Sequence, residues 1–222
     1  MIDWTPFVIS FKLASVTTLI LFIIAVPLAW YLSQTKSFFK PFLVAIFALP
    51  IVLPPSVIGF YAIVILAPTS FLGEFLKEHF NIELLFSFWG LVIASLFYSF
   101  PFMLQPLQSG FESLKRELIE ASYLCGKGYW TTLFRVALPN IKPSILSAIV
   151  ITFAHTIGEF GVVLMVGGNI EGKTKVASVA IYEFVETMDY KSAHIYSAIM
   201  LFISFIILFS VYAINKRFKW SK

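Results

Sequence analysis

Long windows without a charged residue divide this chain. A helix needs about 20 mostly apolar residues to cross the hydrocarbon core of a bilayer. Four windows of at least that length lack Asp, Glu, Lys and Arg, and a fifth is interrupted only by His155 and Glu159. The pattern predicts five membrane-spanning helices, at about residues 8–32, 41–67, 84–108, 143–166 and 192–215.

The predicted fold class is an all-α membrane protein. Lipid offers the backbone no water to bond with, so only helices and closed β-barrels span it, and no segment alternates apolar and polar residues as barrel strands do. Of the 222 residues 59% are hydrophobic and 13% charged, against about 45–50% and 25% in soluble domains. We expect residues 1–222 to form a single transmembrane domain.

Basic residues indicate the orientation. Eleven of the 16 Lys and Arg lie in the segments 33–40, 109–142 and 216–222, and five spans place all three on one side of the membrane. Because basic residues concentrate in cytoplasmic loops, the carboxyl terminus is predicted to be cytoplasmic. The amino terminus and the loops 68–83 and 167–191 then lie outside. The net charge of +4 follows from this topology, so we expect membrane lipid and no nucleic acid as a partner.

The stretch GGNIEGKT, residues 167–174, matches the phosphate-binding pattern G-x-x-x-x-G-K-[ST]. The predicted topology places it outside, away from cytoplasmic ATP. A phosphate-loop ATPase also needs an Asp at the end of an apolar strand to hold magnesium, and neither Asp3 nor Asp189 has that context. We interpret the match as coincidental, a glycine-rich turn after a membrane helix, and expect no catalytic residue in this chain.

The longest cytoplasmic loop is predicted to contain two short helices. Apolar residues recur at steps of three and four from Phe111 to Leu124, which is typical of one helical face. Gly126 and Gly128 are expected to end this helix, because glycine tolerates the left-handed conformation. A second short helix is expected from Tyr129 to about Val136, with its stop near Pro139.

The same loop, EASYLCGKGYWTTLFRVALP, resembles the signature of bacterial ATP-binding-cassette importer permeases: EAA, three residues, G, nine residues, then I-x-L-P. In that family the first short helix of the loop is a coupling helix that lies in a groove of a cytoplasmic ATPase subunit. The resemblance implies that ATP and Mg bind that partner, with no cofactor here. The matching positions are Glu120, Ala121, Gly126, Leu138 and Pro139, with Ser122 for the second Ala and Val136 for Ile.

Three further stretches resemble molybdate permease subunits, within the type I, methionine-permease-like class of these importers. They are residues 49–61, 86–104 and 153–187, and the overall similarity runs from about residue 8 to 214. Sulfate and tungstate permeases look similar, so these two substrates stay open as alternatives. One departure is His155, where many such permeases carry an arginine.

The resemblance implies an assembly in the bacterial inner membrane. Two copies of the chain would form the pathway as a homodimer, since five helices offer little room for a gated pore. Two ATPase subunits would dock on the helix around Glu120, and an extracytoplasmic molybdate-binding protein on the outer loops. A secondary transporter is the remote alternative, but such proteins carry paired broken helices, and the sequence predicts one broken span.

That broken span contains Pro50, Pro54 and Pro55, with Gly59 one turn later. Three prolines remove three amide donors within six residues, so a continuous helix would be costly. Freed carbonyls at membrane depth need protein or a water-filled cavity to face. We therefore expect this span to line the translocation path; a lipid-facing kink is the alternative.

Glu159 is the one acidic residue within a predicted span, with His155 one turn before it and Gly158 and Gly161 beside it. An ionisable group at membrane depth should face a partner or a cavity, and the i, i+4 spacing predicts that His155 and Glu159 pair. A carboxylate in the path would repel an oxyanion, which favours a packing or gating role over contact with the ion. A metal site is not expected, because the other histidines lie in other segments.

Overall fold

The structure, a computed structural model, describes residues 2–220. All its regular elements in that range are helices, and there is no strand. Three helices are long and apolar enough to cross a bilayer: α1 (Thr5–Gln34), α5 (Phe88–Glu112) and, within α12 (Tyr190–Trp220), the part Tyr190–Ser210. Two bent pairs bring the candidates to five: α2 (Lys40–Val52) with α3 (Pro55–Leu66), and Tyr129–Asn140 with α9 (Lys142–Gly158). The predicted all-α membrane class is confirmed.

Helices α1, α5 and α9 form the centre of the bundle, and α12 runs along its side. The apolar side chains of α1 and α5 meet in two buried clusters, one around Trp30, Leu107 and Phe111, the other around Leu13 and Leu91. The start of α5 is fixed by Ser87, whose Oγ accepts the Gly90 N–H at 3.1 Å, as an N-cap does.

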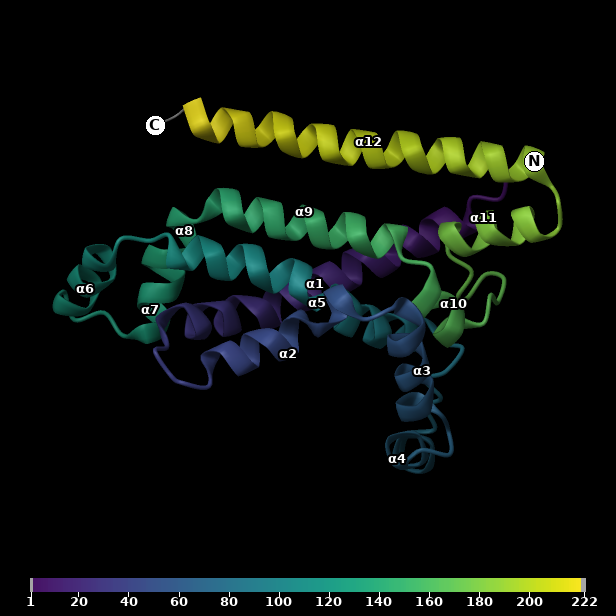
Figure 1. Cartoon of the computed structure of the whole chain (residues 1–222), viewed down its shortest axis with the longest axis horizontal. Helices are drawn as coiled ribbons and strands as arrows, with labels where there is room; N and C mark the ends of the chain where they lie inside the picture. The colour runs from purple at the N-terminus through teal and green to yellow at the C-terminus, as the bar shows by residue number, and fades with distance from the viewer. Residues whose placement is uncertain (1, 221–222) are drawn as a thin grey trace.

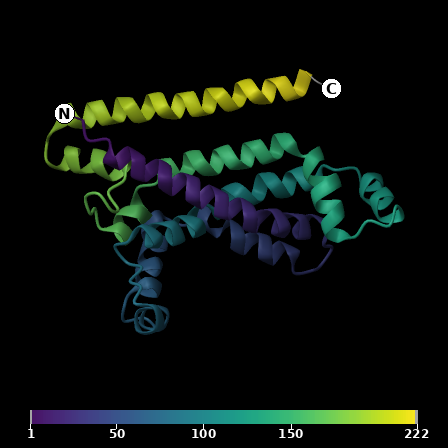
Figure 2. The same ribbon diagram turned by 180° about the vertical axis from the view of Figure 1, so that it is seen from behind.

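The two ends of the bundle differ (Figures 1 and 2). One end, called the outer end below, carries α10 (Gly161–Gly167), α11 (Ala177–Glu186) and the start of α1. The opposite, inner end carries α6 (Arg116–Leu124), α7 (Tyr129–Thr132), the π-helical turn η1 (Leu133–Ala137) and α8 (Leu138–Asn140). The signature loop and the loop with the phosphate-loop pattern are thus at opposite ends.

The predicted break in the second span is confirmed. Between α2 and α3 the chain bends by 107°, with Leu53 and Pro54 both extended. Pro55 begins α3, a position where its missing N–H costs nothing. Helix α3 then packs on α10 and α5 and carries the short helix α4 (Phe71–Phe80) away from the other spans.

A second break, which the sequence did not predict, lies in the span expected at 143–166. Helix α9 ends at Gly158, Glu159 and Phe160 are non-helical, and α10 begins at Gly161. The expectation of a single broken span was therefore wrong, and it no longer argues against a secondary transporter. The sequence gives no sign of this break because it contains no proline and is held by tertiary contacts.

The helices of the signature loop also differ from the prediction. Phe111 belongs to α5 and Leu114 to the connection, so the first loop helix begins only at Arg116. Gly126 follows α6 with a φ of +74°, as expected for its end, whereas Gly128 has an ordinary negative φ. The second helical segment runs past Pro139 to Asn140, and the five residues before Leu138 are wound as a π-helix. Pro139 lacks the N–H that would close an α-helical bond to Arg135, which is compatible with this wider winding.

Candidate functional site

The two broken spans meet at a cavity near the outer end of the bundle. A Cβ added to Gly161 would lie 2.9 Å from Cβ of Pro55, so only a glycine lets the start of α10 approach the start of α3 this closely. The cavity beside this contact has a volume of about 450 Å³. Its lining contains five of the eight predicted pathway residues; the full set is Pro55, Tyr98, Ala154, His155, Gly158, Glu159, Phe160 and Gly161.

Glu159 is held in the gap between α9 and α10 by two serines. Its side chain is buried, with 4% exposed, and its Oε2 accepts a hydrogen bond from Ser95 Oγ at 2.9 Å. Its backbone carbonyl accepts a second bond from Ser178 Oγ at 2.6 Å. Its Oε1 has no hydrogen-bond partner among the described residues. One carboxyl oxygen is therefore buried without a partner, and a conformational change that brought a donor to it would be favourable.

His155 lies on the same cavity but has different partners. Its Nδ1 is 3.0 Å from Ser99 Oγ, and its ring stacks on Phe102 with centroids 3.9 Å apart. The predicted His155–Glu159 pair is wrong: α9 ends between the two side chains, and each one bonds to a different serine of α5. No group of three His, Cys, Asp or Glu side chains that could hold a metal gathers anywhere in the described part of the chain.

Sequence reasoning missed the residues that position these two groups. Ser95 and Ser99 are one turn apart on α5 and both fully buried, so their spacing on an otherwise apolar span was a readable signal. Ser178 gave no such signal, because it lies in the predicted outer loop and reaches Glu159 only in the tertiary structure.

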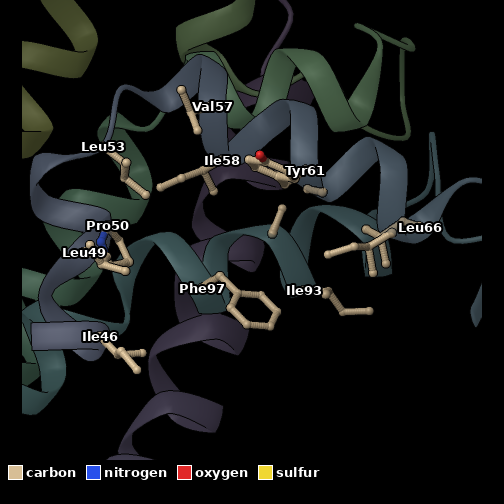
Figure 3. A pocket seen from close by; sticks show the side chains of 13 residues that line it. Ile46, Leu49, Pro50, Leu53, Val57, Ile58, Tyr61, Leu66, Ile93 and Phe97 are labelled. Atoms are coloured by element: carbon tan, nitrogen blue, oxygen red, sulfur yellow. The ribbon is translucent and has the colours of Figure 1, made fainter. Parts of the chain in front are cut away.

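The other predicted pathway residues do not line this cavity. Pro50 lines a separate hollow of about 280 Å³ in the angle between α2, α3 and α5, whose walls are almost wholly apolar (Figure 3). Gly59 packs on α10, where an added Cβ would meet Met165 Sδ at 2.6 Å. Pro54 caps the start of α3. The structure thus divides the predicted set into a polar cavity at Glu159 and an apolar region around the proline break.

The phosphate-loop pattern at 167–174 forms a closed turn. The segment before it is helix α10, where a phosphate loop requires a strand. Thr174 is buried, its Oγ1 donates to the Gly167 carbonyl at 2.6 Å, and it accepts the Ile170 N–H at 3.0 Å. The hydroxyl that would bind Mg in a phosphate loop is therefore occupied in closing the turn.

An ion cluster fastens this turn to α11. Lys175 Nζ lies 2.5 Å from Glu183 Oε2 and 3.4 Å from Glu171 Oε1, and Asn169 Nδ2 donates to the same Glu183 oxygen at 3.2 Å. Burial by itself would lower the pKa of Lys175, but the hydrogen bond and charge of Glu183, assisted by Glu171, raise it. The hydrogen bond from Lys175 lowers the pKa of Glu183 in return.

At the inner end, the signature residues lie close together and most of them are exposed. Ser122, the replacement for the family's second alanine, is buried and its Oγ lies 2.9 Å from Thr132 Oγ1, which ties α6 to α7. Arg116 Nε donates to Glu120 Oε1 at 2.7 Å along the exposed face of α6. Ala121 and Pro139 are exposed, and Leu138 is half-buried against the bundle core.

Helix α6 also presents apolar side chains to solvent. Leu124 is 89% exposed at the tip of α6, and Leu118 and Tyr123 are exposed beside it. Beneath the loop, Trp30 of α1 packs on Phe111 of α5, with ring centroids 5.2 Å apart. An exposed apolar tip on a base anchored to the spans is a surface suited to docking a partner.

Comparison with known sequences gives one family. Residues 22–220 match the profile described as "Binding-protein-dependent transport system inner membrane component". The chain is 43% identical to "Molybdenum transport system permease protein ModB" of Azotobacter vinelandii, over 95% of this chain and 93% of that protein. It is 31% identical to "Sulfate transport system permease protein CysT" of Escherichia coli (strain K12), over 86% of this chain and 69% of that protein.

Solved structures show the same fold at low sequence identity. A chain of a bacterial ABC transporter that imports alginate has a TM-score of 0.79 at 16% identity, covering 96% of this chain and 78% of that chain. A chain of the methionine ABC transporter MetNI in an inward-facing conformation has a TM-score of 0.70 at 15% identity, covering 94% of this chain and 92% of that chain.

Proposed function

This chain belongs to the family of binding-protein-dependent transport system inner membrane components, and we propose that it forms the translocation pathway of an ATP-driven molybdate importer. The proposal that molybdate is the substrate rests on the 43% identity to a molybdenum permease over nearly the whole chain. The sulfate permeases share 30–31%. Tungstate and sulfate are tetrahedral dianions like molybdate, so they are the substrates against which the proposal is tested.

The pathway is proposed to lie between two copies of the chain. In one copy the cavity at Glu159 is partly open, and its lining residues come from α3, α5, α9, α10 and the link between the last two. A second copy related by two-fold symmetry would supply the opposite wall. In this arrangement the outer end of the bundle faces the outside of the cell and the inner end the cytoplasm, as the basic residues of the loops indicate.

Helix α6 is proposed as the docking element for a cytoplasmic ATPase subunit, two of which would serve the dimer and carry ATP and Mg. Its support is local: an exposed apolar tip at Leu124, a left-handed stop at Gly126, and a base tied to α7 through Ser122. The ion pair of Arg116 with Glu120 keeps charge on the exposed face, where it can orient a partner.

A molybdate-binding protein is proposed to dock on the outer end. One solved relative, the alginate transporter, was determined in complex with its ligand-bound periplasmic protein. In the present chain, α11 lies at the outer end and α4 projects from α3, and both expose side chains. The ion would then cross by alternating access, with Glu159 and the two breaks acting as the outer part of the gate. A carboxylate in that position would not hold a dianion, which supports a gating role.

The proposal is tested in liposomes that contain this chain, its ATPase subunit and its binding protein. We expect ATP hydrolysis to rise with molybdate only when all three components are present. Leu124→Asp should remove most of that activity, because it places a charge on the apolar tip of α6. Phe38→Asp is the matched control, since Phe38 is equally exposed at the same end of the bundle and outside α6.

Three results would overturn the proposal or a part of it. If this chain alone hydrolysed ATP or carried ion flux, a partner ATPase would not be needed. If sulfate stimulated the three-component system as strongly as molybdate at equal concentration, the assembly would stand but the substrate would be wrong. Equal loss of activity in the Leu124 and Phe38 variants would remove α6 as the specific docking element.

A further inference from the structure

The first turn of α11 is fastened to two different parts of the bundle. The Ala177 N–H donates to Ser10 Oγ of α1 at 2.9 Å, a contact buried in the protein. The next residue, Ser178, donates its Oγ to the carbonyl of Glu159 at 2.6 Å. One turn of an outer helix therefore bridges α1 and the break between α9 and α10.

The bond from Ser178 falls at a backbone position that has no other way to be satisfied within its helix. Glu159 is the C-cap of α9, and carbonyls at the end of a helix lack intrahelical partners. Glu159 is also buried, so an unpaired carbonyl there would be costly. The backbone position of Glu159, and with it the side chain on the cavity, therefore depends on where α11 lies.

Helix α9 connects this point to the inner end. It is a continuous helix of 17 residues, bounded by the break at Glu159 and by the 83° bend at Ile141. Before that bend come α8, η1 and α7, and α7 is bonded to α6 through Thr132 and Ser122. A shift of the outer end of α9 thus reaches α6 through one rigid helix and one short segment.

Helix α11 is also placed to meet something outside. It exposes Tyr182 and Val185; Met188 in the following connection and Tyr190 at the start of α12 are exposed as well, and all four are large and at least 40% exposed. The ion pair of Lys175 with Glu183 holds the last turn of α11 to the preceding turn at residues 167–175. Force applied to α11 would therefore move it as a unit, together with the groups bonded to it.

We propose that Ser178 is a positioning residue that links docking on α11 to the position of Glu159 and, through α9, to α6. The inference rests on the proposed function, since it requires an outer binding protein and an inner ATPase. A single hydrogen bond, from the Ser178 hydroxyl to the Glu159 carbonyl, transmits the docked state. It predicts that the two ends of the protein can be uncoupled without damaging either.

The experiment compares Ser178→Ala with the wild type in liposomes that contain the ATPase subunit, with and without molybdate-loaded binding protein. We expect basal ATP hydrolysis to change by less than about twofold and stimulation by the binding protein to fall about three- to tenfold, the range in which the loss of one hydrogen bond shifts an equilibrium. Rates are taken well below the unfolding temperature of each variant. Affinity for the binding protein is measured separately and should not change.

Two further variants separate transmission from a structural role. Ser178→Thr keeps the hydroxyl and should restore stimulation. Thr187→Ala is the matched control, since its Oγ1 bonds to Glu183 and Phe184 at the end of α11, and it should behave as the wild type. If Ser178→Ala left the ratio of stimulated to basal ATP hydrolysis unchanged, Ser178 would have no transmitting role. A wild-type assembly with no stimulation at all would instead overturn the proposed function.

Discussion

The two breaks in the spans contact each other but are made in different ways. The break between α2 and α3 contains Pro54 and Pro55 and borders an apolar hollow (Figure 3). The break between α9 and α10 contains no proline, and its central residue, Glu159, is held by Ser95 and Ser178. The first break is set by local covalent chemistry, the second by side chains that are distant in sequence.

This difference bears on which break can move. Two successive prolines remove two amide donors, so a continuous helix from α2 into α3 is disfavoured and the bend is hard to lose. The break at Glu159 depends on hydrogen bonds that can be exchanged for others, with water or with a partner. A break formed by prolines that packs against a break whose hydrogen bonds can be exchanged is a suitable arrangement for a gate.

The largest effect is expected where the two breaks touch. Gly161→Ala would place a Cβ 2.9 Å from the rigid ring of Pro55, and such overpacking typically costs about 1–3 kcal/mol. We expect transport to fall at least about fivefold, because a shift of about 1–3 kcal/mol between conformations changes their ratio about 5- to 150-fold. Gly158→Ala is the control: an added Cβ there meets nothing within 4 Å. Equal transport by the two variants would show that contact between the breaks is unimportant.

The second prediction concerns the exchangeable break alone. Ser95→Ala removes the only hydrogen-bond donor to the Glu159 carboxyl among the described residues, and leaving a buried acceptor unpaired costs about 1–3 kcal/mol. We expect a lower unfolding temperature in detergent. Ser109→Ala, an exposed position on the same helix, should stay within about 0.5 kcal/mol of the wild type. A neutral Ser95→Ala would mean that this bond does not hold the break.

The third prediction is a pH dependence at the turn that supports the second break. The lowered pKa of Glu183 gives stability that is present above about pH 4.5 and is lost as the pH falls through the folded value. The raised pKa of Lys175 gives stability that is present below about pH 10.5 and is lost as the pH rises beyond it. We expect Lys175→Met to flatten both limbs of the stability curve.

The size of this pH effect should be below about 1 kcal/mol, because the Glu183 side chain is 36% exposed and solvent screens exposed pairs. The measurement is the unfolding temperature of the wild type and of Lys175→Met from about pH 2 to 12, a range that includes both limbs. Lys77→Met is the control, since Lys77 pairs with Glu83 near α4, away from this turn. A variant curve parallel to that of the wild type would exclude a contribution from the Lys175 cluster.

The smallest effect is expected at the proline break. In Pro54→Ala the new residue still precedes Pro55, which keeps it extended, so the bend should persist and stability should change by less than about 1 kcal/mol. Distances between spin labels on α2 and α3 measure the bend. A straightened α2–α3 segment in this single variant would show that the break does not rest on local proline chemistry.

Much of this protein was readable from its sequence because the determining forces are local or additive. Apolar windows predicted the spans, since the cost of burying polar groups in lipid adds up along the chain. Pro54 and Pro55 predicted the first break, and Gly126 the end of the first loop helix. Fixed spacing in the signature loop predicted the family, which the profile match confirms.

Other features were decided by the tertiary structure alone. The start of α6 at Arg116, the break at Glu159 and the separate partners of His155 and Glu159 were missed or mispredicted. Each depends on which side chains from other elements are near: an ending helix is stabilised when a distant hydroxyl takes its last carbonyl, as Ser178 does for Glu159. Hydrogen bonds between residues far apart in sequence leave no periodic pattern, so only the folded arrangement of α5, α9 and α11 determines where this second break lies.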